Sequence, residues 1–336
     1  MPKLGSDTVL LFYKDYETDK WIRGDRYLKQ IIRPLYNRLH RRQKVTGFLV
    51  AYHLLVKALR QQGLDVRSND YAAARRHPEH PVGLFGYPQQ LDGWSLPNPA
   101  VLGPGLFDHP KLAPGLMEDP RNRFYVVTSE WVRRMFAPYY GDSCVVWFAG
   151  VDLKEWPDAR EHPKDIDVLI YDKIHWDRGH YERELVRPIQ DRLARDGVRT
   201  ETIRYKQYDH GVYRQTLARS RSMLFLGEHE TMGLAYQEAL ASNVPVLAWD
   251  NGYWLDPQRL LYEAEPVPAS SVPYFSEGCG ERFRDSGEFD AAFERFWSRL
   301  DSYEPRRFVA GELSQEKSAQ LYMEYYRQAA QPRGHP

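Results

Sequence analysis

Apolar residues in the first half of the chain alternate between short extended runs and segments with helical spacing. This alternation is typical of a parallel sheet covered by helices. Residues 9–13 form the first extended run, and apolar positions at helical spacing follow from 48 to 59, before a stop signal at Gly63. The pattern predicts further strands at 82–85, 124–128 and 144–148, and a helix at 130–136.

The same alternation starts again after the polar stretch 155–165. Predicted strands lie at 167–171, 202–204, 223–226 and 244–249, and predicted helices at 185–193, 212–220, 231–242 and 314–327. A further helix is predicted over 289–300, where five apolar residues, four of them aromatic, lie on one side. Pro188 marks a kink or a late helix start, and Ser314 is a candidate cap for the last helix. Two such series predict an α/β fold with two doubly wound, Rossmann-like domains that face each other across a ligand-binding cleft.

The domain limits follow from this pattern. We expect residues 1–152 to form an N-terminal, acceptor-binding domain with a basic insertion at about 14–45. Residues 153–310 would form a C-terminal donor domain, and 311–336 a helix and tail that can return to the N-terminal domain.

Composition narrows the function classes. The 46 basic and 46 acidic residues cancel, so no global field favours nucleic acid. No run approaches the roughly 20 apolar residues of a membrane-spanning helix. The chain has two cysteines, no apolar signal core and no Asn-x-Ser/Thr acceptor. These features predict a cytoplasmic protein.

The segment 226–252 reads as a strand, a turn, a helix and another strand, and it carries two glutamates, Glu230 and Glu238. Eight helical steps span roughly 12 Å, which exceeds the separation of paired glycosidase carboxyls. The spacing suits one glutamate on sugar hydroxyls and the other on ribose hydroxyls. A helix that opens near Thr231 would direct the amides of Thr231, Met232, Gly233 and Leu234 at a diphosphate between them.

This segment resembles the donor-site signature of retaining GT-B glycosyltransferases, above all glycosyltransferase family 4. The shared pattern is Glu230, seven residues and Glu238, followed by a strand that begins Val-Pro-Val. The segments 128–136 and 150–157 and the turn Thr46-Gly47 are also similar to that family. The chain departs from it by having Thr-Met-Gly after the first glutamate, where the family has glycine, an aromatic residue and glycine.

The resemblance implies a glycosyltransferase that moves a sugar from a nucleoside-diphosphate sugar to an acceptor hydroxyl, with retention and without a metal or cofactor. It implies that Glu230 contacts the sugar and Glu238 the ribose, and that Gly47 lies at the donor site. Lys173 and Arg178 would hold the diphosphate, in the reverse of the family's Arg-then-Lys order. A GT-B sugar-nucleotide epimerase and a non-catalytic interaction subunit are the alternatives.

Other candidate residues have two interpretations each. Tyr205, with Lys206, is either a base contact or part of a surface loop, and His109 is either a sugar or acceptor contact or a loop histidine. His77 and His80 lack further ligands at zinc spacing, so we expect no metal site.

Residues 26–44 carry seven Lys or Arg and no acid, with apolar residues along one helical side. This basic amphipathic pattern indicates either an insertion helix packed on the first domain or peripheral contact with the inner, anionic membrane surface. The acceptor would accordingly be a glycan, a lipid-linked molecule or a small molecule.

Overall fold

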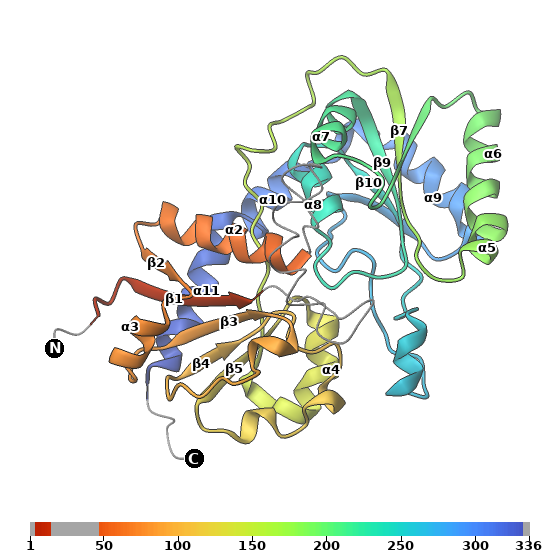
Figure 1. Ribbon diagram of the computed structural model, residues 1–336. Helices are drawn as coiled ribbons and strands as arrows, with labels where there is room; N and C mark the ends of the chain where they lie inside the picture. The colour runs from red at the N-terminus through yellow and green to blue at the C-terminus, as the bar shows by residue number, and fades with distance from the viewer. Residues whose placement is uncertain (1–3, 15–46, 332–336) are drawn as a thin grey trace, which may run out of the picture. The chain divides into compact units, whose positions relative to one another are not determined.

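The computed structural model describes residues 4–14 and 47–331. The chain divides into two compact units. Unit 1 comprises residues 1–127, 136–145 and 319–336, and unit 2 comprises residues 128–135 and 146–318. Each unit is an α/β structure built on its own sheet (Figure 1). The basic stretch 26–44 lies outside the described residues.

Unit 1 is built on a six-stranded sheet of order β2-β1-β3-β4-β5-β6, and the pairs from β2 to β5 are parallel. The strands are β1 (Thr8–Lys14), β2 (Asp65–Ser68), β3 (Val82–Gly86), β4 (Ala100–Leu102), β5 (Asn122–Val127) and β6 (Cys144–Val146), with helices α2 (Gly47–Gln61), α3 (Tyr71–Arg76), the second half of α4 (Glu130–Tyr140) and most of α11 (Gln315–Ala329). The first half of α4, which includes Trp131, belongs to unit 2.

Successive residues of β1 point to opposite faces of this sheet, as the pleat requires. The Phe12 ring lies 4.8 Å from that of Tyr71 on α3, whereas the Tyr13 ring lies 5.3 Å from that of Tyr52 on α2. Helices therefore cover both faces.

Unit 2 has a five-stranded parallel sheet of order β11-β10-β9-β7-β8. Its strands are β7 (Ile166–Lys173), β8 (Thr200–Arg204), β9 (Ser220–Gly227), β10 (Val246–Trp249) and β11 (Gly280–Phe283), with helices α5 (Arg178–Tyr181), α6 (Arg187–Arg195), α7 (His210–Arg219), α8 (Leu234–Ala241), α9 (Ser286–Ser298) and α10 (Pro305–Glu312). A π-helical turn, Glu182–Val186, joins α5 to α6, and Pro188 lies in the first turn of α6.

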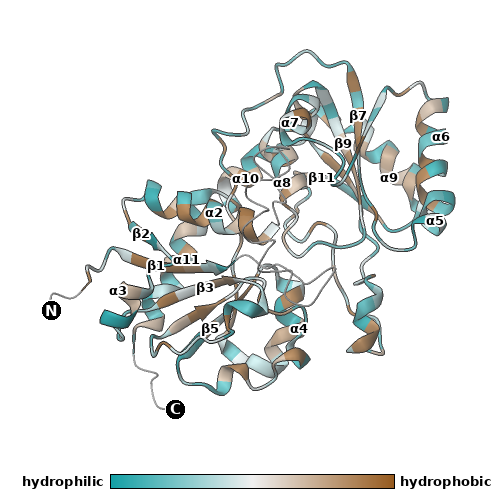
Figure 2. Ribbon diagram, viewed as in Figure 1, coloured by the Kyte–Doolittle hydropathy of each residue, from teal (hydrophilic) through white to brown (hydrophobic). Residues whose placement is uncertain are grey.

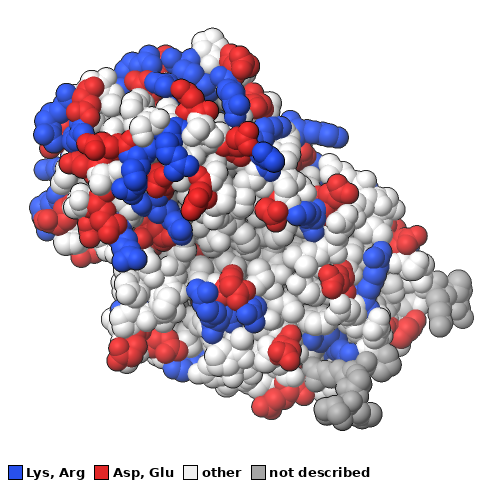
Figure 3. Space-filling view, turned by 180° about the vertical axis from the view of Figure 1, so that it is seen from behind, with Lys and Arg blue, Asp and Glu red and all other residues white. Residues whose placement is uncertain are grey.

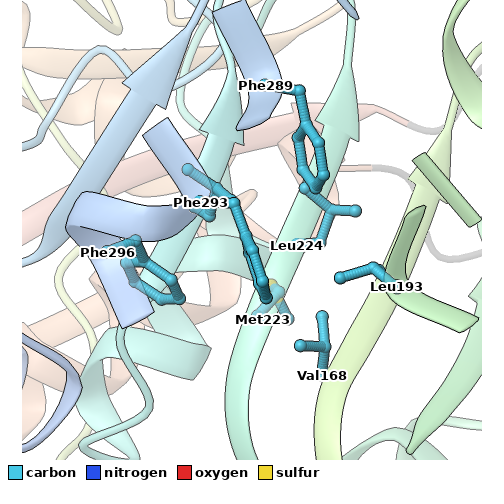
Figure 4. Close-up of a pocket in the computed structure, with 8 residues that line it drawn as sticks. Val168, Leu193, Met223, Leu224, Phe289, Phe293 and Phe296 are labelled. Carbon is cyan, nitrogen blue, oxygen red and sulfur yellow. The ribbon is translucent and has the colours of Figure 1, made fainter. Parts of the chain in front are cut away.

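Alternate residues of β7 enter two separate cores, because both faces of this sheet are covered. Leu169 and Tyr171 pack with α7, α8 and α10, while Val168 and Ile170 pack with α6 and α9. Figure 2 shows the apolar strands between helices that are polar on their outer sides. The gap in Figure 4 lies in the second core and is lined by apolar side chains, including Leu193, Phe289 and Phe293. It is a packing gap without polar groups to bind a ligand.

Most of the predicted elements are confirmed, with ends that differ by a few residues. Ser314 caps α11 as expected, since its hydroxyl accepts a hydrogen bond of 3.3 Å from the Lys317 amide. The sequence patterns did not predict β2, β4 and β11, which have three or four residues each.

Candidate functional site

The candidate site lies at the carboxyl edge of the unit 2 sheet, where the order of the strands reverses. The chain passes from β7 to β8 on one side and then returns to β9 on the other. Lys173, the last residue of β7, is in register with Gly227, the last residue of β9. The loops after these two strands therefore start at the same edge, which is the usual ligand position in such sheets.

Lys173 and Glu230 form an ion pair at this reversal point. Their side chains are only 19% and 10% exposed, so little water reaches the pair. The Lys173 Nζ atom also lies 4.6 Å from the centre of the Tyr205 ring, which follows β8. The structure thus brings three of the predicted donor-site residues together.

The backbone of Glu230 is fixed on both sides of the residue. Its amide donates a hydrogen bond of 2.9 Å to the Ser270 carbonyl, and its carbonyl accepts one of 2.8 Å from Nε1 of Trp131. The carboxylate therefore projects from an anchored loop, which limits its positions before any ligand arrives.

Glu228 is a buried site residue that the sequence did not reveal. It is 2% exposed, and its Oε1 accepts hydrogen bonds of 2.6 Å and 2.8 Å from the amides of His175 and Trp176. Glu228 thereby ties the loop after β9 to the loop after β7. The sequence feature that could have indicated Glu228 is its position two residues before Glu230, in the run Glu-His-Glu at 228–230.

His229, between these two glutamates, lies in an aromatic cluster. Its ring stacks on Trp176 at 5.2 Å and 8°, and meets Trp131 and Trp254 edge-on at 6.0 Å and 6.3 Å. Burial lowers the pKa of His229 to about 4, with Lys173 adding to the effect, so the ring is neutral at physiological pH.

Arg178, the second predicted phosphate ligand, contacts carboxylates. Its guanidinium donates to Asp172 at 2.5 Å and to Glu182 at 2.6 Å. Asp172 is 3% exposed and belongs to β7. Arg178 is thus placed one loop away from Lys173, with its charge compensated by these two acids.

The expected helix start at Thr231 is wrong, because α8 begins at Leu234. Gly233 precedes it with φ +79°, a left-handed conformation that breaks the helical path. Thr231 and Met232 consequently belong to the loop. The unpaired amides of the first helical turn belong to Leu234 and the two residues after it. A Cβ atom on Gly233 would lie 2.0 Å from Cε1 of Tyr236, so glycine is also required for space.

Glu238 lies in α8, and its Oε1 is 3.5 Å from Nε2 of His210. Burial raises the pKa of Glu238, and the hydrogen bond with His210 counters this in part. Tyr208 lies in the electrostatic field of both glutamates. Its pKa is raised to about 12, mainly by burial and further by Glu238 and Glu230.

Two predicted site residues belong to unit 1. Gly47 is the exposed first residue of α2. His109 is fully buried, and its Nδ1 accepts a hydrogen bond of 3.2 Å from the Lys111 amide, which caps the short turn Pro110–Leu112.

Three further observations concern residues 4–14 and 47–331. No group of three or more His, Cys, Asp or Glu in these ranges is arranged to hold a metal ion. None of their helices combines the length and apolar character needed to cross a membrane. On the face in Figure 3, basic and acidic side chains are interspersed rather than gathered by sign.

No protein-family model matches this chain, and a search of curated proteins finds no match by sequence. Solved structures are similar in fold. A trehalose 6-phosphate synthase from Burkholderia multivorans has a TM-score of 0.51 at 14% identity, over 89% of this chain and 81% of that one. A glycosyltransferase of avilamycin A biosynthesis has a TM-score of 0.50 at 15% identity, over 86% and 91%. The catalytic domain of starch synthase IV from Arabidopsis thaliana has a TM-score of 0.50 at 12% identity, over 75% and 73%. The chain therefore has the GT-B fold of these enzymes.

Proposed function

We propose that this protein is a glycosyltransferase that uses a nucleoside-diphosphate sugar. The observation that carries the proposal is the Lys173–Glu230 ion pair at the strand reversal of unit 2, with Glu238 further along the same segment. A cation paired with one carboxylate, and a second carboxylate eight residues further along the chain, provide groups for a diphosphate and for the hydroxyls on either side of it.

Each residue has a distinct role in this proposal. Glu230 accepts hydrogen bonds from the donor sugar, and Glu238 accepts them from the ribose. Lys173 and the amides of the first turn of α8 stabilise the departing diphosphate, and Arg178 supplements them if it exchanges a carboxylate partner for phosphate. We propose retention of configuration without a protein nucleophile, so that catalysis comes from positioning and charge stabilisation.

The similar structures support a nucleotide donor and a sugar acceptor. The starch synthase domain was solved with ADP and acarbose, a nucleoside diphosphate and an oligosaccharide analogue. By analogy, we propose a nucleotide sugar as donor for this chain, with a glycan, a lipid-linked molecule or a small molecule as acceptor.

A thermal-shift panel of UDP, ADP, GDP and their common sugar conjugates tests the donor proposal. A diphosphate at 100 times its dissociation constant should stabilise the fold by about 2.7 kcal/mol. We propose that no divalent metal is required, so the shift should persist with EDTA. The donor proposal fails if none of these compounds shifts the transition, and strict metal dependence would overturn metal independence alone.

A lipid-linked acceptor would be reached from the cytoplasmic membrane surface, and residues 26–44 are our candidate for that contact. Each Lys or Arg near an anionic surface contributes about 1 kcal/mol. Replacing Arg33, Arg41, Arg42 and Lys44 by Gln should abolish sedimentation with phosphatidylserine vesicles and leave nucleotide binding unchanged. If the wild-type protein does not sediment with these vesicles at low salt, the proposed membrane contact of residues 26–44 is refuted.

A further inference from the structure

The carboxylate of Glu238 is engaged by a single imidazole. His210 is the first residue of α7, and its Nε2 lies 3.5 Å from Oε1 of Glu238 on α8. The Glu238 side chain is 16% exposed and that of His210 is 58% exposed, so the carboxylate is the inner member of the pair. In the part of the chain that the structure describes, this is the one ion pair of Glu238.

The imidazole of His210 is held in place by its surroundings. Its ring meets Trp156 at 5.3 Å and 86°, and the Arg214 guanidinium lies 5.0 Å from the centre of the Trp156 ring. The Asp209 side chain caps α7 through a hydrogen bond of 2.7 Å from the Gly211 amide. The α7 cap and the ring contact with Trp156 therefore restrict His210, although more than half of its side chain is exposed.

The charges around this pair favour an imidazolium. His210 experiences the carboxylates of Glu238 and Asp209 and the opposing charge of Arg214. The hydrogen bond to Glu238 is the largest influence and raises the pKa of His210. Glu238 experiences His210 and Arg214, and also the like charge of Glu155. Tyr208 and Tyr213, which also face Glu238, are kept neutral by burial, which raises their pKa values.

We propose that His210 is a positioning residue for ribose recognition: it fixes Oε1 of Glu238, so that Oε2 is presented to a ribose diol. This inference rests on the proposed function and identifies the substrate class as ribonucleotides rather than deoxyribonucleotides. A carboxylate that is oriented before binding loses less freedom when the hydroxyls arrive.

The proposal fixes the sign of a pH effect. A ribose over the pair excludes water and strengthens the attraction between imidazolium and carboxylate. The pKa of His210 therefore rises further in the complex, and binding takes up a proton. Affinity for a ribonucleotide should fall as the pH rises through the pKa of His210. A ribose that displaced His210 from Glu238 would give the opposite sign.

The test measures dissociation constants by calorimetry from pH 6 to 9 for UDP, ADP and GDP and for the 2′,3′-dideoxy form of each. The proteins are wild type, His210→Gln, Glu238→Gln and the double variant. Gln keeps a neutral N–H donor but cannot become charged, and His162→Gln, at an exposed position outside the site, is the matched control. The diphosphate itself also ionises in this pH range, but its effect cancels when the dissociation constant of the variant is divided by that of wild type at each pH.

We expect His210→Gln to weaken ribonucleotide binding about fivefold at pH 6, because hydrogen bonds to charged groups are stronger than neutral ones. At pH 9 the substitution should hardly change the affinity. This effect should vanish with the dideoxy compounds and in the Glu238→Gln background. An equal loss for the dideoxy compounds, a ratio independent of pH, or the opposite pH trend would overturn the role of His210. If wild type binds none of the nucleotides, the proposed function falls, and this inference falls with it.

Discussion

At the scale of single residues, the Lys173–Glu230 pair makes the sharpest prediction. Lys173→Met should weaken nucleoside-diphosphate binding at least about tenfold by removing a phosphate contact. It should also destabilise the fold by about 3 kcal/mol, since Glu230 would stay buried without its partner. Calorimetry and urea unfolding measure the two effects.

Lys173→Arg is the matched control, because it keeps the positive charge. It should retain most of the binding and most of the stability. Equal losses in the Met and Arg variants would show that Lys173 acts through packing rather than through its charge.

Glu238 has a separate expected effect on binding. Glu238→Ala should weaken nucleoside-diphosphate affinity by about 1.5–3 kcal/mol, because it removes the charged group that we propose as the acceptor for ribose hydroxyls. Isothermal titration with UDP, ADP and GDP measures this change. An unchanged dissociation constant would remove Glu238 from the donor site.

The low pKa of His229 predicts that the folded protein loses stability as the pH falls. Its pKa of about 4 in the folded protein lies below the ordinary value of 6.5. The unfolded chain therefore binds a proton first as the pH falls, and stability is lost between about pH 6.5 and 4. His229→Phe keeps an aromatic ring and should remove on the order of 2 kcal/mol of this loss. Unfolding curves at pH 7.5 and 4.5 give the free energy of unfolding of wild type and of the variant. An equal decrease in both proteins between these pH values would contradict the prediction.

At the scale of elements, the start of α8 depends on one glycine. Gly233→Ala should destabilise the protein by more than about 2 kcal/mol for two reasons. Alanine is strained in the left-handed conformation, and its Cβ atom would collide with the Tyr236 ring. It should also weaken diphosphate binding by shifting the first-turn amides. Gly179→Ala is the control, since its Cβ would meet only the end of Arg183 at 3.8 Å. A Gly233→Ala protein as stable as this control would show that the turn adapts.

The sequence predicted elements that have a strong apolar period and missed those that lack one. Helix α9 was recognisable from aromatic residues at helical spacing. Strand β2 has only one buried residue among its four, so it has no alternation to detect, and β4 has only three residues. The helix start at Thr231 was misplaced because the sequence does not show that Gly233 adopts a left-handed conformation.

The same contrast applies to the candidate site. Glu230 and Glu238 share one segment, so the sequence predicted them together, and the family pattern predicted Lys173 as a phosphate contact. Glu228 was missed because its partners His175 and Trp176 are more than fifty positions away in sequence and meet it only through the register of β7 with β9. The contact of His210 with Glu238 likewise depends on how α7 and α8 pack.

At the scale of the whole molecule, the proposed donor-site residues Lys173, Glu230 and Glu238 all belong to unit 2, whereas unit 1 has a separate sheet. Nucleoside diphosphate should therefore slow amide hydrogen exchange mainly in the loops after β7 and β9 and in α8. Mass spectrometry of exchanged peptides, with β1 and α2 as internal references, measures this difference. Slowing confined to unit 1 peptides would refute the assignment of the donor site.

Helix α11 has a consequence for biosynthesis. Its Tyr326 hydroxyl accepts a hydrogen bond of 2.8 Å from the Leu10 amide and donates one to the Pro81 carbonyl, while Tyr322 fills the space beside Gly83. Complete packing of the first sheet therefore needs residues that leave the ribosome after those of unit 2. Unit 2 can reach its final packing earlier, and a nascent chain arrested before residue 315 would expose the apolar face of the first sheet to chaperones and proteases.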